Sequence, residues 1–297
     1  MNKNLAAHIA LLLTNLFFAI NLSAVKFLTN NALAQPFGIN VIRVGVSVIL
    51  FWALFLLKPV NVRIERKDTG RFLACALTGI AINQLLFLKG LSLTYSIHAA
   101  LLMLIVPILI VVGAAIVLKE RISLLRVTGL ALGVAGAIVL ISARDSAGNA
   151  GNVIWGDVLI VINAISYTIF FILVKPLMIK YNPIVVTRWI FTFGLFMVLP
   201  FGWTEFTNIR WQSFGVTGYT SIVLIVFFGT FLAYLFNVYG IKILGAATAG
   251  SYIYTQPFFA AAIAMIFLKE PLQPYKIVAA GLIFSGVYLA NKKVKHD

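Results

Sequence analysis

Residues 90–120 read GLSLTYSIHAALLMLIVPILIVVGAAIVLKE, and residues 240–270 read GIKILGAATAGSYIYTQPFFAAAIAMIFLKE. The two stretches align at a fixed offset of 150 positions, which gives ten identities over residues 90–140. Most identities are small or apolar residues, which an apolar chain matches by chance. The informative matches keep their spacing: Gly90 with Gly240, Ala99 with Ala249, Pro107 with Pro257, and Leu118-Lys119-Glu120 with Leu268-Lys269-Glu270. This register predicts an internal duplication.

The composition places the duplicated chain in a membrane. Of its 297 residues, 62% are hydrophobic and only 10% are charged, whereas a soluble domain has about 25% charged residues. A membrane-spanning helix needs about 20 apolar residues. Ten such runs are centred near Phe17, Val48, Ala81, Leu109, Leu132, Ser166, Phe196, Val226, Ala262 and Ile283. The sequence therefore predicts an all-α polytopic membrane protein with ten transmembrane helices and short loops.

The net charge of +15 is explained by insertion in a membrane rather than by a nucleic-acid partner. In a soluble chain such a charge would suggest nucleic acid, but the positive-inside rule explains it here. With a cytoplasmic N-terminus and ten alternating spans, fifteen of the 23 Lys and Arg residues fall on the cytoplasmic side and six on the outer side. We therefore expect both termini in the cytoplasm, insertion in the cell (inner or plasma) membrane, and no nucleic-acid partner.

The duplication predicts two oppositely oriented halves. Residues 1–142 would form the first repeat with spans 1–5, residues 143–156 a turn-rich linker that contains SAGNAGN, and residues 157–297 the second repeat with spans 6–10 and a basic tail. Because five is an odd number, the second half must lie upside down relative to the first. Inverted repeats are typical of transporters, whose substrate site lies near the midplane between the repeats and is exposed alternately to the two sides.

Other classes of protein are excluded by what the sequence lacks. The first apolar run, residues 5–28, exceeds the about 7–15 residues of a signal-peptide core, so we expect an uncleaved span. A single cysteine, Cys75, rules out an internal disulfide and a cysteine-rich metal site. The motifs GxxxxGK[ST], HExxH and GxSxG are absent. We therefore predict no enzyme activity, no metal site and no cofactor.

The paired LKE motif, the 5+5 arrangement and the chain length resemble the drug/metabolite transporter superfamily, and within it the EamA-like ten-helix family. The resemblance covers residues 5–291. It implies a carrier that exports amino acids or other small metabolites, while a related branch moves nucleotide sugars or triose phosphates. It also implies a central cavity between spans 1–4 and 6–9, with spans 5 and 10 at the periphery. Many members carry Trp-Gly early in span 1, where this chain reads NLFFAIN at residues 15–21.

The ionisable residues inside the predicted spans are basic. All eight Asp and Glu residues lie at predicted span ends, in loops or in the tail, so neither a carboxylate Na⁺ site nor a mid-membrane proton relay is expected. Arg43 and Arg188 lie deepest, and ionisable groups within a membrane are functional candidates. Lys26 and Lys175 lie nearer the mouths of the cavity, where they either meet an anionic substrate or extend to the interface.

Further polar residues complete the predicted cavity. His98 either couples proton movement to transport, since free histidine titrates near about pH 6.5, or packs against a neighbouring hydroxyl or carbonyl. Pro107 and Pro257 should kink spans 4 and 9. The predicted substrate-binding residues are Arg43, Arg188, Asn83, Gln84, Tyr95, His98, Tyr234, Asn237, Tyr252, Tyr254 and Gln256, and the predicted gating or mouth residues are Lys26, Lys175, Pro107 and Pro257.

The sequence thus predicts a secondary transporter that exports a small anionic or zwitterionic metabolite, such as an amino acid, by alternating access. Two alternatives stay open: a nucleotide-sugar or phosphorylated-metabolite exchanger, which the basic mouths would suit, and a non-transporting membrane sensor or assembly factor. The expected partners are the lipid bilayer and a small-molecule substrate. Gly129, Gly133 and Gly136 form a small-residue face on span 5, which serves either packing within the chain or a homodimer seam.

Overall fold

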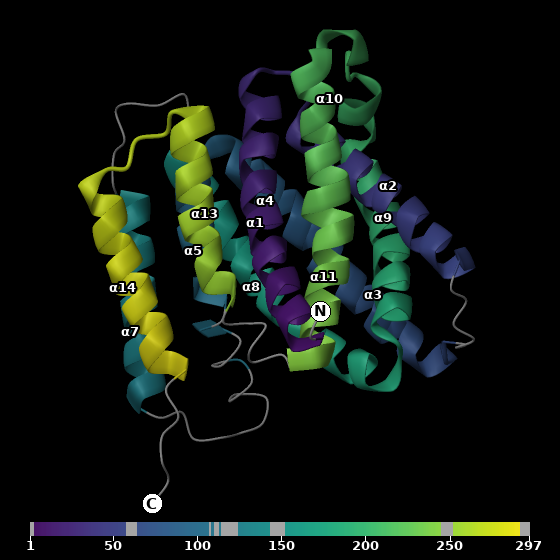
Figure 1. Ribbon diagram of the computed structural model, residues 1–297, viewed down its shortest axis with the longest axis horizontal. Helices are drawn as coiled ribbons and strands as arrows, with labels where there is room; N and C mark the ends of the chain where they lie inside the picture. Colours follow the sequence, from purple (N-terminus) through teal and green to yellow (C-terminus); the bar gives the residue numbers. More distant parts are fainter. Residues whose placement is uncertain are drawn as a thin grey trace, which may run out of the picture.

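The structure, a computed structural model, describes residues 3–57, 64–106, 108–109, 113, 124–142, 152–244 and 252–291. Within these ranges every regular element is a helix and no strand is present. The helices pack side by side, with their axes in broadly one direction (Figure 1). The all-helical architecture expected from the composition is confirmed. Pro107, Lys119, Glu120, Ala249 and residues 143–151 of the predicted linker lie outside the described residues.

In the first half, two long helices precede a run in which the helix type changes. This half contains α1 (Lys3–Asn30), α2 (Pro36–Leu57), the 3-10 turn η1 (Arg66–Asp68), α3 (Thr69–Ala76), the π-helix η2 (Leu77–Ile82), α4 (Asn83–Leu93), α5 (Ser96–Leu102) and α7 (Leu124–Ser142). Because η1, α3, η2 and α4 follow one another without a gap, they form one long helix with a π-helical segment inside it.

The second half has a similar series. It contains α8 (Val153–Lys180), α9 (Pro183–Thr207), the 3-10 turn η3 (Trp211–Ser213), α10 (Gly215–Val223), the π-helix η4 (Leu224–Leu232), α11 (Ala233–Leu244), the 3-10 turn η5 (Tyr252–Thr255), α13 (Gln256–Ile263), the π-helix η6 (Ala264–Leu268) and α14 (Pro274–Asn291). The π-helices η2 and η4 contain Gly79 and Gly229, which are again 150 positions apart. The two halves thus share an irregularity as well as a sequence pattern.

Six helices in the described ranges are long and apolar enough to cross a membrane. They are Lys3–Asn30, Pro36–Leu57, Arg66–Leu93, Val153–Lys180, Ile184–Thr207 and Gly215–Asn237. These coincide with predicted spans 1, 2, 3, 6, 7 and 8. The helices α7 and α14 and the helical run Tyr252–Leu268 lie at predicted spans 5, 10 and 9. A multi-pass membrane protein is therefore evident, while the count of ten crossings stays a prediction.

Asparagine side chains define where two of the long helices begin. Asn152 Oδ1 accepts a hydrogen bond from Trp155 N at 3.2 Å, so α8 begins at Val153, four residues before the predicted second repeat. Asn182 Oδ1 accepts from Ile184 N at 2.9 Å, and Pro183 follows at the first helical position of α9. Asparagine and proline are favoured at these positions because they satisfy or remove unpaired backbone N–H groups.

The bundle has two distinct ends. The first residues of α1 and the last residues of α14 lie at the same end, lowermost in Figure 1, which we call the proximal end. At the opposite, distal end α1 leads into α2 and η6 leads into α14 (Figure 1). Beginning and ending on one side is what an even number of crossings requires. The assignment of the proximal end to the cytoplasm stays a prediction.

Helices of the two halves pack in matched pairs: α4 along α8, α11 along α1, α2 along α9, and α7 along α14. A Cβ atom on Gly90 would lie 2.9 Å from Gly156 O, and one on Gly240 would lie 2.4 Å from Leu11 Cδ2. A side chain at either position would force a neighbour to move, a backbone atom at Gly90 and a leucine side chain at Gly240. Residues 90 and 240 therefore make corresponding crossings, α4 on α8 and α11 on α1, which supports the predicted duplication.

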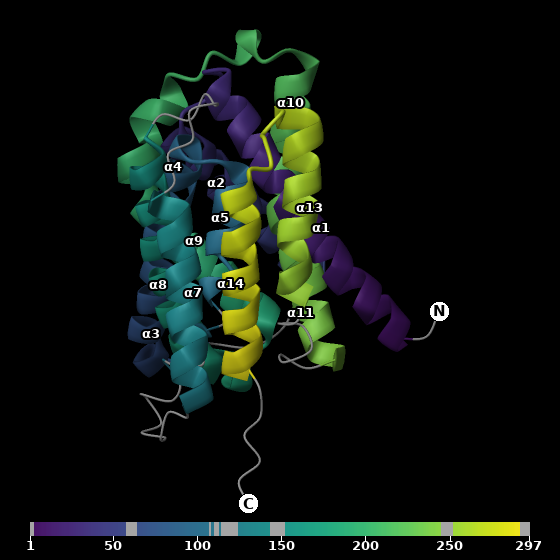
Figure 2. The same ribbon diagram turned by 90° about the vertical axis from the view of Figure 1, so that its left-hand side faces the viewer.

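The small-residue face of α7 packs inside the chain. A Cβ on Gly136 would lie 2.6 Å from Ile283 Cγ1, and one on Gly286 would lie 2.5 Å from Gly129 O. Figure 2 shows α7 and α14 side by side along most of their length. Of the two predicted roles for this face, packing within the chain is therefore present, and a homodimer stays a prediction.

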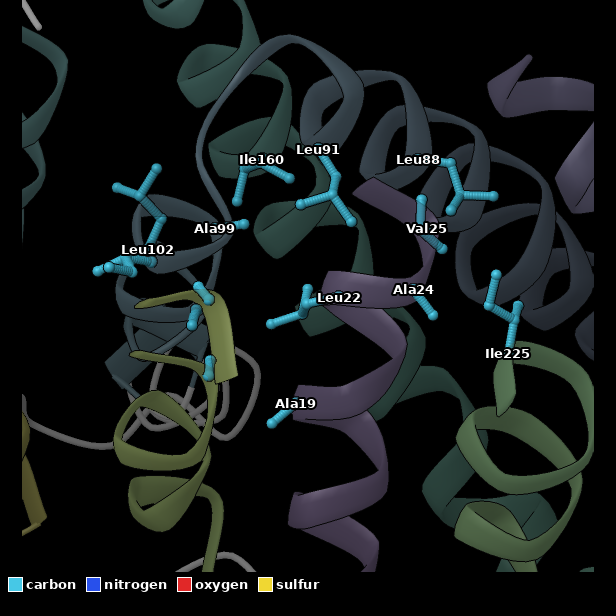
Figure 3. Close-up of a cluster of buried hydrophobic side chains, with 14 of the residues drawn as sticks. Ala19, Leu22, Ala24, Val25, Leu88, Leu91, Ala99, Leu102, Ile160 and Ile225 are labelled. Carbon is cyan, nitrogen blue, oxygen red and sulfur yellow. The ribbon is translucent and has the colours of Figure 1, made fainter. Parts of the chain in front are cut away.

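Two apolar clusters fill the bundle. The first surrounds α1 and includes Leu22, Val25, Leu88 and Ile160, and Figure 3 shows Val25 next to Leu88. The second lies between α2, α3 and α9 and includes residues 51, 72 and 191, all phenylalanine. On α2, Ile42 belongs to the first cluster and Val44 to the second. The intervening residue, Arg43, is thus held at the boundary between the two clusters.

Candidate functional site

Three polar side chains share one face of α2. Asn40, Arg43 and Ser47 are three and four positions apart, a spacing that aligns residues on a helix. Their relative exposures are 0%, 6% and 0%. Asn40 Nδ2, Asn40 Oδ1 and Ser47 Oγ have no hydrogen-bond partner in the part of the chain that the structure describes. Each such buried group costs about 1–3 kcal/mol, so this face is suited to a polar ligand or water.

The π-helix η4 holds the Arg43 side chain. Arg43 Nε donates a hydrogen bond to Thr230 Oγ1 at 2.7 Å. The Thr230 hydroxyl in turn donates to Ile225 O, five residues earlier, at 2.9 Å. That second bond uses the only proton of the hydroxyl and leaves its oxygen free to accept from Arg43. Segments of π-helix occur frequently at functional sites, and here one fixes the position of the guanidinium.

The surroundings of Arg43 contain phenols rather than acids. Arg43 interacts electrostatically with Tyr234 on α11, and Tyr234 with Tyr167 on α8. Tyr234 also packs edge-on against Phe191, with ring centroids 5.2 Å apart. None of the ion pairs among the described residues involves Arg43. A buried guanidinium without a carboxylate partner favours binding of an anionic group.

The first helix adds an amide to this site. A Cβ on Gly229, the neighbour of Thr230, would lie 3.0 Å from Asn21 Oδ1, and that oxygen is buried without a partner among the described residues. We call Asn21, Asn40, Arg43, Ser47, Thr230 and Tyr234 the Arg43 centre. Its residues come from predicted spans 1, 2 and 8, so both halves of the chain contribute.

A second group of amides lies between α4 and α8. Asn163 Nδ2 donates to the backbone oxygen of Asn83 at 2.6 Å. Asn163 Oδ1 and Gln84 Oε1 are buried without a partner among the described residues. Two predicted residues, Asn83 and Gln84, therefore lie beside an asparagine that the sequence analysis missed.

Arg188 lies in an aromatic environment apart from Arg43. Its Cζ is 3.7 Å from the ring centroid of Phe55 and 4.4 Å from that of Trp52. Its Nε and Nη1 are buried without a partner in the described part of the chain. Trp52 follows Arg43 by nine residues on α2, which corresponds to about 13 Å along the helix. The structure therefore does not bring the two predicted arginines together.

A polar cluster at the distal end contains His98. His98 Nδ1 lies 2.9 Å from Asp157 Oδ2, and His98 Nε2 lies 3.1 Å from the Tyr275 hydroxyl. Thr94 donates to the other carboxylate oxygen, Asp157 Oδ1. The side chains of His98 and Asp157 are both fully buried. We call Lys26, Thr94, Tyr95, His98, Asp157, Glu270, Tyr275 and Lys276 the distal cluster.

Lys26 belongs to this cluster instead of lining an open mouth or extending to the interface. It is 2% exposed, and its Nζ donates to Leu91 O and to Ser92 O, both at 3.1 Å. These carbonyls lie in the last turn of α4, where a cation interacts favourably with the helix dipole. Lys26 thus forms a buried link between α1 and α4, and its role at the mouth of the cavity stays a prediction.

The predicted residues of span 9 lie elsewhere. The Tyr252 hydroxyl is 2.7 Å from His8 Nδ1 near the start of α1, and Tyr254 contacts Phe284 edge-on, with centroids 6.5 Å apart. Gln256 begins α13, and Pro257 follows in its first turn. Pro257 therefore begins an α-helix after the 3-10 turn η5 instead of kinking a continuous one.

Two further predicted residues lie on described helices. Asn237 is half-buried on α11. Lys175 lies within α8, and its side chain is not among those described. Apart from Asn237, Lys175 and Pro107, the predicted set divides between the Arg43 centre, the amides of α4, the distal cluster, the aromatic environment of Arg188 and span 9.

Large apolar side chains are exposed on the outer faces of the helices, while a number of polar side chains are buried between them. Residues 49, 196, 201 and 216 are Ile, Phe, Phe and Val with exposures of 67%, 68%, 63% and 85%. Exposed apolar helices around buried polar side chains are typical of a multi-pass membrane protein.

Comparison with known sequences gives the family. The sequence profile of the EamA-like transporter family matches residues 5–142 and 154–292, and the chain belongs to this family, within the drug/metabolite transporter superfamily. The family profile matches each half separately, and the division into two inverted repeats stays a prediction.

Two relatives agree with this assignment, and one solved structure shares the fold. An uncharacterized transporter of Archaeoglobus fulgidus is 26% identical over 285 residues, 96% of this chain and 98% of its own. A protein of Streptantibioticus cattleyicolor described as a "Probable terminal-alkyne amino-acid exporter" is 25% identical over 239 residues, 79% of this chain and 77% of its own. One crystal structure matches with a TM-score of 0.60 at 19% identity, over 98% of this chain and 96% of its own, and supports the fold alone.

Proposed function

We propose that this protein is a secondary transporter that exports a small zwitterionic metabolite, an amino acid or a close analogue, by alternating access. The observation that carries the proposal is the Arg43 centre. It presents one buried guanidinium, with no carboxylate partner among the described residues, beside buried polar atoms without partners. A carboxylate would bind Arg43, because paired hydrogen bonds to an ionised group are the strongest that a guanidinium makes.

The remaining atoms of the centre suit an ammonium group. Asn21 Oδ1, Asn40 Oδ1 and Ser47 Oγ are buried oxygens that accept no hydrogen bond within the described residues. An ammonium carries three donors and no acceptor, so neutral oxygens can bind it without an acidic residue. One fixed cation together with several neutral oxygens matches a zwitterion better than a free cation.

The same arrangement disfavours a phosphorylated substrate. A phosphate with about two negative charges generally meets more than one cation. In this chain Lys26 is bound to carbonyls of α4, and Arg188 is enclosed by aromatic rings. The Streptantibioticus relative, a probable terminal-alkyne amino-acid exporter, also favours an amino acid.

Different contacts close the two ends of the bundle. At the distal end, His98 and Asp157 join α5 to α8. At the proximal end, Lys180 of α8 lies 2.7 Å from Glu65 and 2.6 Å from Asp68, just before and within η1. Alternating access needs two such closures that open in turn, and each of these joins predicted spans of opposite halves.

Efflux profiling tests the proposal. Cells that overproduce the wild type, Arg43→Ala or Arg188→Ala would be loaded with mixed dipeptides, and the medium would be assayed for amino acids by mass spectrometry. We expect a class of amino acids to appear with the wild type and to fall at least about tenfold with Arg43→Ala, since a hydrogen bond to a charged group contributes about 1.5–3 kcal/mol. Arg188→Ala is the matched control and should retain export.

Two outcomes would contradict the proposal. Export that survives Arg43→Ala would return Arg43 to a structural role. An absence of wild-type export for every amino acid would favour the sensor or the phosphorylated-metabolite exchanger. Equal amounts of each variant in the membrane, measured by fluorescence-detected size-exclusion chromatography, separate these outcomes from a loss of folding.

A further inference from the structure

His98 joins three helices through its two ring nitrogens. It lies on α5, its Nδ1 contacts Asp157 on α8 at 2.9 Å, and its Nε2 contacts the hydroxyl of Tyr275 on α14 at 3.1 Å. Ring centroids of His98 and Tyr275 are 5.9 Å apart and nearly perpendicular. Because residues 98 and 157 are fully buried, the ring is shielded from the surface in this arrangement.

The hydrogen bonds determine which nitrogen carries the proton. An ionised carboxylate only accepts, so Asp157 Oδ2 requires a proton on Nδ1, while its Oδ1 accepts from Thr94. In neutral His98 the Nε2 atom is then the acceptor, and the Tyr275 hydroxyl donates to it. A proton added to Nε2 makes this nitrogen a donor and forces the Tyr275 hydroxyl to reverse. Proton binding therefore alters the contact that joins α5 to α14.

Further charged groups lie on elements packed around α5. Glu270, which precedes α14, accepts from Ser96 N at 2.9 Å and from Ile97 N at 3.3 Å. The Lys276 ammonium lies 4.4 Å from the ring centroid of Tyr95 and 5.7 Å from that of Tyr275, and Lys26 of α1 interacts electrostatically with Glu270. Two more helices pack against α5: α13 has the sequence QPFFAAAI and contributes no titratable side chain, and α4 carries Lys89, whose side chain is exposed.

The formal charges balance only when His98 is neutral. Asp157 and Glu270 contribute two negative charges, and Lys26 and Lys276 two positive charges. A proton on His98 leaves one uncompensated positive charge among buried groups, which is unfavourable unless the site gains water or an anion. Proton binding should therefore weaken the closed distal end.

We infer that His98 and Asp157 form a proton-binding site, and that a proton taken up at His98 Nε2 from the distal side opens the distal end. The inference rests on the proposed function, because coupling of this kind has a purpose only in a carrier with two alternating openings. It assigns the proton as the co-substrate: one proton enters from the distal side while the metabolite leaves toward it.

A cysteine reporter tests the inference without a substrate. Ser96 is fully buried beside the cluster, and its Oγ has no partner among the described residues, so Ser96→Cys in a Cys75→Ala background should be tolerated. The labelling rate with a membrane-impermeant maleimide would be measured at about pH 5.5 and about pH 8, on either side of the ordinary histidine value. His98→Gln, which can donate to Asp157 and accept from Tyr275 without taking up a proton, is the reference at each pH.

We expect the rate relative to His98→Gln to rise at least about fivefold at the lower pH, which reports a population shift toward the open state. Tyr275→Phe keeps the ring but removes the hydroxyl, so it should raise labelling at both pH values. A flat ratio, or an unchanged rate in Tyr275→Phe, would overturn the inference. Should His98→Gln fail to fold, Tyr275→Phe against the parent still decides it.

The two proposals fail separately. If the distal end opens with pH but the protein exports no amino acid, the proton site is supported and the proposed function is wrong. If the protein exports amino acids but the labelling rate does not depend on pH, the proposed function is supported and the proton site is wrong.

Discussion

At the scale of single residues, Thr230 determines how Arg43 is presented. Its hydroxyl accepts from Arg43 Nε and donates to Ile225 O. Thr230→Val keeps the shape of the side chain but leaves a charged donor without its partner. A hydrogen bond to a charged group contributes about 1.5–3 kcal/mol, so we expect the apparent affinity for the exported amino acid to fall about tenfold or more.

The control for this prediction is Thr192→Val. Thr192 accepts from Trp52 Nε1 at 3.1 Å and donates to Arg188 O at 2.8 Å, so it has the same hydrogen-bonding role away from the Arg43 centre. Concentration-dependent efflux from vesicles would measure both variants. Equal affinities in the two would contradict the role given to Thr230.

The ionised side chain of Glu65 makes the stability of the proximal end depend on pH. Hydrogen bonds from Lys180 and Lys67 hold the pKa of Glu65 below its ordinary value. Its contribution to stability is therefore present above the ordinary value of about 4.3 and is lost as the pH falls through the lower pKa of the folded state. Because the carboxylate is half exposed, the effect should be a small decrease in Tm.

Thermal unfolding in detergent, measured between about pH 6 and pH 3.5, tests this prediction. The difference in Tm between the wild type and Glu65→Gln should shrink steadily as the pH falls. A difference that stays constant over this range would mean that the ion pairs of Glu65 contribute nothing measurable.

At the scale of helices, the crossings of α4 on α8 and of α11 on α1 differ in the atoms that lie against their glycines. A Cβ on Gly90 would meet a backbone atom, Gly156 O, at 2.9 Å, whereas one on Gly240 would meet the end of the Leu11 side chain. Backbone cannot move aside as a leucine methyl can. Overpacking costs about 1–3 kcal/mol, which for a chain of this size lowers Tm by about 2–8 °C. We expect Gly90→Ala at the upper end of this range and Gly240→Ala at the lower.

Gly281→Ala on α14 is the control, because a Cβ there would have no atom within 4 Å. It should leave Tm unchanged or raise it slightly, since alanine favours a helix by about 1 kcal/mol over glycine. Thermal unfolding of the three variants in one detergent ranks them. Equal losses at residues 90 and 281 would show that the close approach of α4 to α8 does not matter for stability.

The sequence predicts well where the helices lie along the chain, but it predicts poorly which helices pack against one another. The apolar runs gave α1, α2, α8 and α9, because a span requires a continuous stretch of apolar residues. The face formed by Asn40, Arg43 and Ser47 could have been found from spacing alone, since residues three and four apart align on a helix. By contrast, His98 and Asp157 are separated by 59 positions, and no periodic pattern indicates which helices cross there.

The type of helix could not be predicted from the sequence either. The bond from Thr230 to Ile225 spans five residues, which the π-helix η4 makes possible and an ordinary helical period of about 3.6 residues does not indicate. The glycines at residues 79 and 229 could have shown that η2 and η4 are equivalent segments of the two halves. They could not have shown that these segments are π-helices. Arg43 was therefore predicted, while the threonine that orients it was missed.

At the scale of the whole molecule, closure of the proximal end rests on Lys180. This side chain connects the end of α8 to Glu65 and Asp68 near the start of the third predicted span. Cys75 lies fully buried one helix further in, within the same apolar cluster as Tyr181. If the two halves rock against each other, removing this link should shift the population toward a state that is open at the proximal end.

Lys180→Gln should therefore increase the rate at which a maleimide modifies Cys75, by about threefold or more. Lys67→Gln is the matched control: Lys67 also contacts Glu65, at 2.8 Å, but it lies only two residues away and joins no second helix. Both rates would be measured in open membranes, so that the reagent reaches both sides. Equal rates in the two variants would mean that the proximal end opens independently of Lys180, and would leave only the distal cluster as a controlled gate.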